Sequence, residues 1–199
     1  MTTEERDPDY VWYGGRPSIH LVNTRRYRFE GGRELLREPA DLSRWLEAAE
    51  LTPGRAAVDE ALLAAAIELR EAIDRGLIAV VAGEPLAAEP VQVVNTWLAR
   101  AAQYPPHLDL VDGLPVFRVN TVPSDAFGAL CRIAVDAAEM LGSDLRTRLR
   151  ICAGANCSAR FIDNSAGRRR RWCSMAACGN RAKASQHRQT AAARSRAGA

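Results

Sequence analysis

The stretch "CAGANCSARFIDNSAGRRRRWCSMAACGNR", residues 152–181, holds four of the five cysteines of this 199-residue chain. They form two close pairs, Cys152 with Cys157 and Cys173 with Cys178, and fifteen residues separate the pairs. This arrangement is typical of tetrathiolate zinc sites, in which each pair supplies two corners of a tetrahedron. The gap of four residues within each pair is longer than the commonest gap of two. The pattern predicts one structural Zn²⁺ bound by all four thiolates.

Other uses of the cysteines are less consistent with the pattern. An iron–sulfur cluster and unbound thiols are the alternatives, whereas a redox pair would need a C-x-x-C spacing beside a βαβ pattern. Four thiolates leave no coordination position for water or substrate, so a catalytic zinc is disfavoured. The chain also has no Ser-His-Asp, paired-carboxylate or glycine-rich phosphate motif, and we expect no enzyme activity. The fifth cysteine, Cys131, lies in an apolar run and is predicted to be a buried core thiol.

The residues between the cysteine pairs suggest a small finger. "ARFID" (159–163) and "RRRRW" (168–172) look extended, and "NSAG" (164–167) between them is typical of a turn, so we expect a hairpin. A helix is predicted to start near Cys178, which completes the knuckle, hairpin and helix of a zinc-ribbon or treble-clef-like finger. The segment has too few apolar residues to fold alone, so zinc would supply about 10 kcal/mol of its folding free energy.

Charge divides the chain into an acidic body and a basic end. Residues 146–199 hold thirteen Lys and Arg residues against one acid, Asp163, for a net charge of +12, whereas residues 1–145 carry −9. Such asymmetry indicates a polyanionic partner, and duplex DNA is the first candidate. Only Lys183 is a lysine, so a genome-wide codon bias also accounts for much of the arginine content.

Six residues of the basic end are predicted to contact nucleic acid. If residues 168–172 form a strand, side chains alternate, and Arg169 and Arg171 face away from Trp172. The alternative for this run is a strand that meets only solvent. Along the following helix, phosphate contacts are expected from Arg181, Lys183, His187 and Arg188.

Two residues are predicted to support the metal site. Trp172 directly precedes Cys173 and is expected to cover the zinc, with base stacking as its alternative role. Asn180, together with Arg181, would cap the finger or hydrogen-bond the cysteine sulfurs, and DNA contact is an equal alternative for both.

Residues 1–145 are predicted to form a mostly helical domain with one small hairpin, so the fold class is α+β. Apolar residues at helical spacing indicate a short helix within 38–53 and longer ones over about 56–82, 89–102 and 124–141. The inward residues of the third are expected to be Val91, Val94, Leu98 and Ala101.

The remaining segments of this domain show turn patterns. "HLDLVDGLPVFRVN" (107–120) alternates apolar and polar residues around Asp112-Gly113 and predicts the hairpin, and Pro115 suits an edge strand. Residues 19–24 are expected to form a short helix or strand after a glycine turn. The charge changes sign near Gly142, which suggests a domain of residues 1–145, a finger of 146–190 and a frayed tail of 191–199.

The segment "RRWCSMAACGNR" (170–181) resembles the CGNR zinc-finger family, which is named after the tetrad found here at residues 178–181. The matching residues also include Cys152, Cys157, Phe161, Asp163 and Lys183. The resemblance implies zinc binding by the four cysteines and a role in DNA-binding transcriptional regulation.

The N-terminal part resembles the ABATE domain, which often precedes this finger and is described as a stress-induced transcription regulator. The matching pieces are "GGRPSIHLVNT" (14–24) and "EPADLSRWLEAAEL" (38–51). Where that domain often has an acidic residue, this chain has His20. If the segment lines a ligand pocket, His20, Asn23 and Thr24 are the residues expected to line it.

The sequence therefore predicts a bacterial-type transcription regulator with one structural Zn²⁺ and duplex DNA as its partner. A protein-interaction adaptor that docks on an acidic partner, and a small-molecule-binding N-terminal domain, are the alternatives. A homodimer is a further expectation. The acidic start and the lack of any run near the roughly 18 apolar residues of a membrane span predict a cytoplasmic protein without membrane contact.

Overall fold

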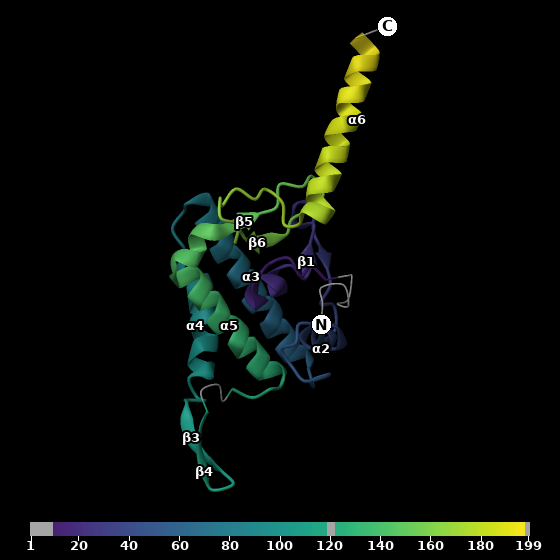
Figure 1. Ribbon diagram of the computed structural model, residues 1–199. Coiled ribbons are helices and arrows are strands. Elements are labelled where there is room, and N and C mark those ends of the chain that lie inside the picture. The colour runs from purple at the N-terminus through teal and green to yellow at the C-terminus, as the bar shows by residue number, and fades with distance from the viewer. Residues whose placement is uncertain (1–9, 119–121, 198–199) are drawn as a thin grey trace.

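The computed structural model describes residues 10–118 and 122–197 (Figure 1). Its N-terminal part is built from the helices α1 (Pro17–Val22), α2 (Pro39–Ala48), α3 (Glu60–Ala82), α4 (Ala88–Ala101) and α5 (Ala126–Gly142). The long helices α3, α4 and α5 pack against one another, and α1 and α2 each pack against α3 and α5. The predicted mostly helical domain is confirmed.

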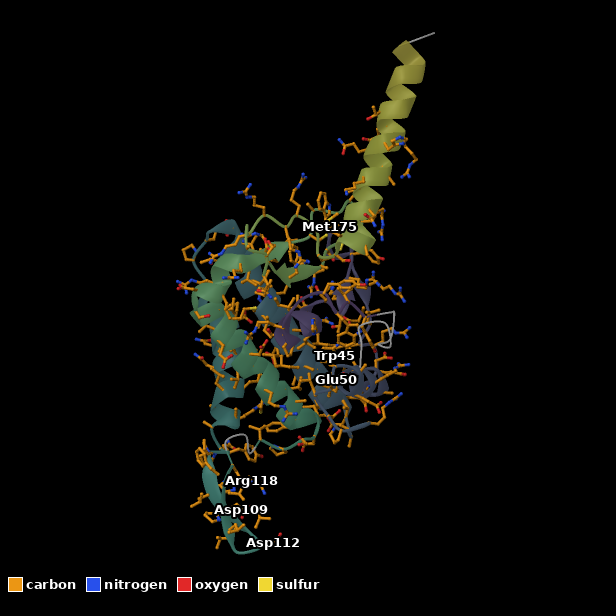
Figure 2. All side chains as sticks on the ribbon, in the orientation of Figure 1. Trp45, Glu50, Asp109, Asp112, Arg118 and Met175 are labelled. Atoms are coloured by element: carbon orange, nitrogen blue, oxygen red, sulfur yellow. The ribbon has the colours of Figure 1, made fainter. Side chains whose placement is uncertain are left out.

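These helices enclose one main hydrophobic core. Trp45 from α2, Leu69 and Ile73 from α3 and Leu130 from α5 are fully buried in it, and Figure 2 shows Trp45 inside the body. Cys131 is fully buried beside them, as predicted. Burial of large apolar side chains stabilises the domain by about 1.5–3 kcal/mol each, so this core holds the scaffold on which the C-terminal part rests.

Local residues set the ends of α3. The Asp59 carboxylate accepts a hydrogen bond from the Leu62 backbone N–H (2.8 Å), and this cap starts the helix at Glu60 rather than near the predicted residue 56. Gly83 ends it, as predicted, with a positive φ of 75° that favours glycine.

Helix α4 buries a face that differs in part from the predicted one. Val94 is buried and Leu98 and Ala101 pack half-buried against the core, as expected, but Val91 is 40% exposed and Trp97 is buried instead. The Trp97 ring packs 5.5 Å from the Phe127 ring of α5, and burying this larger side chain rotates the helix face away from Val91.

Two small antiparallel hairpins belong to the N-terminal part. β1 (Arg25–Arg26) pairs with β2 (Arg33–Glu34), and the short 3₁₀ turn η1 (Arg28–Glu30) lies between them. β3 (His107–Val111) pairs with β4 (Leu114–Arg118) around Asp112-Gly113, which confirms the predicted hairpin; its last two predicted residues, 119 and 120, lie outside the described residues. The β3–β4 hairpin projects from the lower end of the body in Figure 1.

The C-terminal part has a knuckle, a hairpin and a helix, the three parts of the predicted finger. After the 3₁₀ turn η2 (Asp144–Arg148) come β5 (Leu149–Ile151), β6 (Arg160–Ile162), the turn η3 (Met175–Gly179) and α6 (Asn180–Ala197). α6 extends away from the body at the end opposite β3–β4 (Figure 1). It includes residues 191–197, for which the sequence predicts a frayed tail.

The hairpin of the finger differs from the predicted one. β6 pairs with β5, which precedes the first cysteine pair, and not with residues 168–172, which form no strand. The β5–β6 hairpin also joins the body, because Leu149 and Ile162 lie in the main core and the Ile162 N–H donates to the Gly14 carbonyl (3.0 Å). The finger and the helical part thus share one core.

Candidate metal centre and basic surface

The four cysteines meet at one point although they come from different segments. Cys152 follows β5, Cys157 lies just before β6, Cys173 follows the arginine run and Cys178 lies in η3. Their sulfur atoms all lie within 4.8 Å of one another, with 3.8 Å from Cys157 to Cys173 and 3.7 Å from Cys173 to Cys178. A tetrahedron with Zn–S bonds of about 2.3 Å has edges of about 3.8 Å. Donor type and spacing therefore fit one tetrahedral zinc ion.

The thiols also bias one another's ionisation. Hydrogen bonds with Cys157 and Cys173 lower the pKa of Cys152, whereas hydrogen bonds with Cys152 and Cys157 raise the pKa of Cys173. Burial, followed by the charge of Cys157, raises the pKa of Cys178 to about 12. Thiols packed this closely ionise together only when a cation offsets their charge, and Zn²⁺ supplies that charge.

The backbone around the cysteines is shaped for the cluster. The Cys173 N–H donates to the Cys152 sulfur (3.4 Å). A Cβ added at Gly154 would lie 3.3 Å from the Cys157 Cβ and 3.5 Å from the Cys178 sulfur, so the first knuckle has little room for a larger residue. This close approach explains a glycine between the two cysteines of the first pair.

Two aromatic side chains pack with the cysteine cluster. Phe161 of β6 is fully buried in a second small core that contains three of the cysteines, and Trp172 packs against it half-buried. Trp172 thus lies beside the cysteines, and its role as a cover for the metal stays a prediction. Asn180 is exposed at the start of α6.

The arginine run is irregular because Asp163 and Phe161 hold it in place. The Asp163 carboxylate accepts hydrogen bonds from the Arg170 N–H (2.8 Å) and from the backbone and hydroxyl of Ser165. Although burial opposes ionisation, these bonds keep the pKa of Asp163 below its usual value. Arg168 adopts a positive φ of 49°, which strand geometry does not allow.

The four arginines of the run consequently have different surroundings. The Arg170 guanidinium lies 4.9 Å from the centre of the Phe161 ring and donates to the Cys173 carbonyl (2.6 Å), so it supports the metal centre. Arg168, Arg169 and Arg171 are exposed, and Arg171 lies over the Trp172 ring (5.2 Å). The predicted alternation is wrong, because the run forms a loop: Arg168 is exposed together with Arg169 and Arg171, and Arg171 lies over the Trp172 ring instead of facing away from it.

The predicted nucleic-acid contacts form two groups beside the zinc centre. Arg169 and Arg171 lie on the loop before Cys173, while four exposed residues lie on α6, namely Arg181, Lys183, His187 and Arg188. Figure 2 shows Met175, in the turn that carries Cys178, at the base of α6. Both groups are thus tied to the zinc ligands through short stretches of chain.

The residues predicted to line an N-terminal pocket are engaged by the protein itself. The Asn23 amide donates to the Arg160 carbonyl (3.0 Å) and accepts from the Arg160 N–H (2.9 Å). The Thr24 hydroxyl donates to the Leu21 carbonyl and accepts from Arg70 (3.2 Å). His20 accepts from the Gly15 N–H and packs edge-on against Trp12. Asn23 and Thr24 therefore connect parts of the fold.

A partly buried ion-pair network joins the finger to α3, and the sequence did not predict it. Arg160 pairs with Asp74 (2.7 Å), which also contacts Arg28 (3.1 Å), and Arg28 pairs with Glu71 (2.7 Å). The network continues through Arg70 to Glu34 (2.6 Å); burial opposes ionisation of Glu34, but the Arg70 guanidinium keeps its pKa below the usual value. In the sequence, only the presence of two charged residues, Arg70 and Asp74, beside the apolar stripe of the predicted helix indicated buried ion pairs there.

None of the helices in the described ranges is long and apolar enough to cross a bilayer.

Comparison with known families agrees with this organisation. The model of the ABATE family, described as "Putative stress-induced transcription regulator", matches residues 15–144, and the CGNR zinc-finger model matches residues 148–191. Neither description is that of an enzyme. Comparison with curated proteins found no match. The order of the two matches, the four-sulfur cluster and its tetrahedral spacing lead to one assignment. This chain belongs to the ABATE family, and its C-terminal part is a CGNR zinc finger whose four cysteines form the site of one structural zinc ion.

Proposed function

We propose that this protein is a transcription regulator that binds duplex DNA through its zinc-held basic C-terminal part. One observation carries the proposal: the finger exposes arginine and lysine side chains but no acidic side chain. Its only acid, Asp163, is fully buried and hydrogen-bonded, whereas Arg168, Arg169, Arg171, Arg181, Lys183 and Arg188 are exposed. Such a surface attracts phosphates by releasing condensed counterions from DNA.

The rest of the molecule would orient this binding. Four thiolates on one Zn²⁺ lower the charge of residues 146–199 from +12 to about +10, so the finger remains strongly basic. Residues 1–145 carry a net charge of −9, which repels DNA. The finger end would therefore approach DNA first, and the helical part would remain free for regulation.

A binding series across salt concentration tests this function. Zinc-loaded full chain is titrated into a labelled duplex at several salt concentrations, and the logarithm of the affinity should fall linearly with the logarithm of salt. Lys183→Ala should reduce the slope by about 1. A chain without salt-dependent affinity for any duplex would contradict the proposal.

An acidic protein surface is the second candidate partner. The exposed Arg169 and Arg171 lie on a loop separate from α6 and could serve a different partner. The double variant Arg169→Glu, Arg171→Glu distinguishes the two: an adaptor would lose capture of its protein partner and keep its DNA affinity, whereas a DNA-binding loop would lose DNA affinity.

The proposed role is non-enzymatic, because four protein thiolates fill the coordination sphere of zinc. The five cysteines form no disulfide, which suits a reducing compartment, and we propose the cytoplasm. The part in the stress response rests on the family description alone.

We also propose that the chain forms a homodimer through β3–β4. Strand pairing places Leu108 opposite Phe117 and Leu110 opposite Pro115, so these four share one face. All are exposed, Leu110 to 73%, while the opposite face carries the Asp109–Arg118 ion pair (3.6 Å; Figure 2). A two-stranded hairpin is marginally stable alone in water, and an identical uncharged face on a second copy is its simplest complement.

A further inference from the structure

Most of the described side chains of helix α6 are exposed to solvent. The helix leaves the body at the zinc finger (Figure 1), and the side chains of residues 180–190 are exposed except for the half-buried Ala182 and Ser185. Eighteen residues of α-helix are about 27 Å long. A helix that is polar on all sides does not owe its place to a hydrophobic core, and its surface is open to a partner.

Seven of the described side chains of α6 form three rows. Because successive residues turn by about 100°, Arg181 and Arg188 share one side of the helix, and Lys183 and His187 share a side about 200° away from Arg181. Between these two basic rows lies a third row of neutral side chains. It consists of Ala182, Gln186 and Gln189 at spacings of four and three residues.

This arrangement matches the major groove of B-form DNA. The groove is about 12 Å wide, accepts one α-helix and is walled on each side by a phosphate backbone. A helix with basic rows on two sides can contact both walls, and the row between them then faces the base edges. Glutamine can form two hydrogen bonds with the N6 and N7 atoms of adenine, and Gln186 and Gln189 are both exposed.

Charge complementarity selects DNA as the occupant. Residues 180–197 contain no Asp or Glu, so nothing in the sequence of the helix would repel phosphate. Duplex RNA has the same charge, but its major groove is deep and narrow and does not admit a helix.

We propose that α6 lies in the major groove of B-form DNA, with Arg181 and Arg188 toward one strand, Lys183 and His187 toward the other, and Gln186 and Gln189 reading base edges. This inference rests on the proposed DNA-binding function and adds to it the element and the residues that give sequence preference.

The test separates base reading from charge. A preferred duplex is selected from a random pool with zinc-loaded full chain, and affinities are measured for that duplex and a scrambled one. The double variant Gln186→Ala, Gln189→Ala should lose at least about tenfold of the preference while its affinity for the scrambled duplex stays unchanged. Lys183→Ala should weaken both duplexes equally. Gln92→Ala, an exposed glutamine of α4, is the matched control and should change neither.

A second measurement addresses the groove. Methylation of guanine N7, which lies in the major groove, should weaken binding of the selected duplex. If the wild-type chain binds DNA but shows no preference, keeps its preference in the double glutamine variant, or binds methylated DNA or duplex RNA equally well, the inference is wrong while the proposed DNA-binding function stands. If no duplex is bound in a salt-dependent way, the proposed function itself fails.

Discussion

At the scale of single residues, Asn23 links the helical part to the finger. Its amide bonds both backbone groups of Arg160, and all of these groups are buried. Removing the amide would leave a buried N–H and a buried carbonyl without their partner, and the cost of unsatisfied buried groups is about 1–3 kcal/mol. Asn23 therefore holds β6 of the finger, at Arg160, against the end of α1.

The variant Asn23→Ala should lower the free energy of unfolding of the zinc-loaded chain by about 1–3 kcal/mol. Urea unfolding measures this directly. Asn164→Ala, at an exposed asparagine of the finger, is the matched control and should change the stability by less than about 0.5 kcal/mol. Equal stability of the two variants would show that the Asn23–Arg160 link contributes little.

The role of Asn23 could not be predicted from its neighbours in sequence. A polar residue at the end of a short helix suits a ligand pocket as well as an internal hydrogen bond, and its partner Arg160 lies 137 residues away. The same holds for Asp74, whose partner Arg160 belongs to a strand of the finger. The four cysteines were predictable because their chemistry and spacing are both local.

At the scale of elements, predictions succeeded where short-range patterns decide the structure. The β3–β4 hairpin follows from Asp112-Gly113, both of which adopt positive φ angles in the turn, between alternating residues. The arginine run has an extended-looking sequence but forms a loop, because Asp163 binds its backbone and Phe161 holds Arg170. These contacts join residues that are seven or more positions apart, so they produce no periodic sequence pattern from which the loop can be predicted.

The exposed apolar face of β3–β4 leads to a prediction about assembly. Leu110→Lys places a charge on the proposed dimer face and should convert a dimer to a monomer in light scattering. Leu114→Lys is the matched control, since Leu114 is 69% exposed but belongs to the opposite face, and it should leave the dimer intact. A wild-type chain that is monomeric, or two variants with the same mass, would refute dimerisation through this face.

At the scale of the whole molecule, the zinc centre connects the two basic groups. Arg171 lies two residues before Cys173, and α6 begins two residues after Cys178, so binding of one ion positions the loop and the helix together. The β5–β6 hairpin of the finger places Leu149 and Ile162 in the main core of the helical part. A continuous packed structure therefore connects the helical part to the end that we propose binds DNA.

In the proposed function, zinc organises the surface that binds DNA. The most direct test is a titration of labelled duplex DNA with the zinc-loaded chain, repeated after chelation and again after zinc is restored. Chelation should abolish most of the affinity, and about one zinc per chain should restore it, whereas Cys173→Ser should not recover. DNA affinity that is unchanged by removal of zinc would contradict the account.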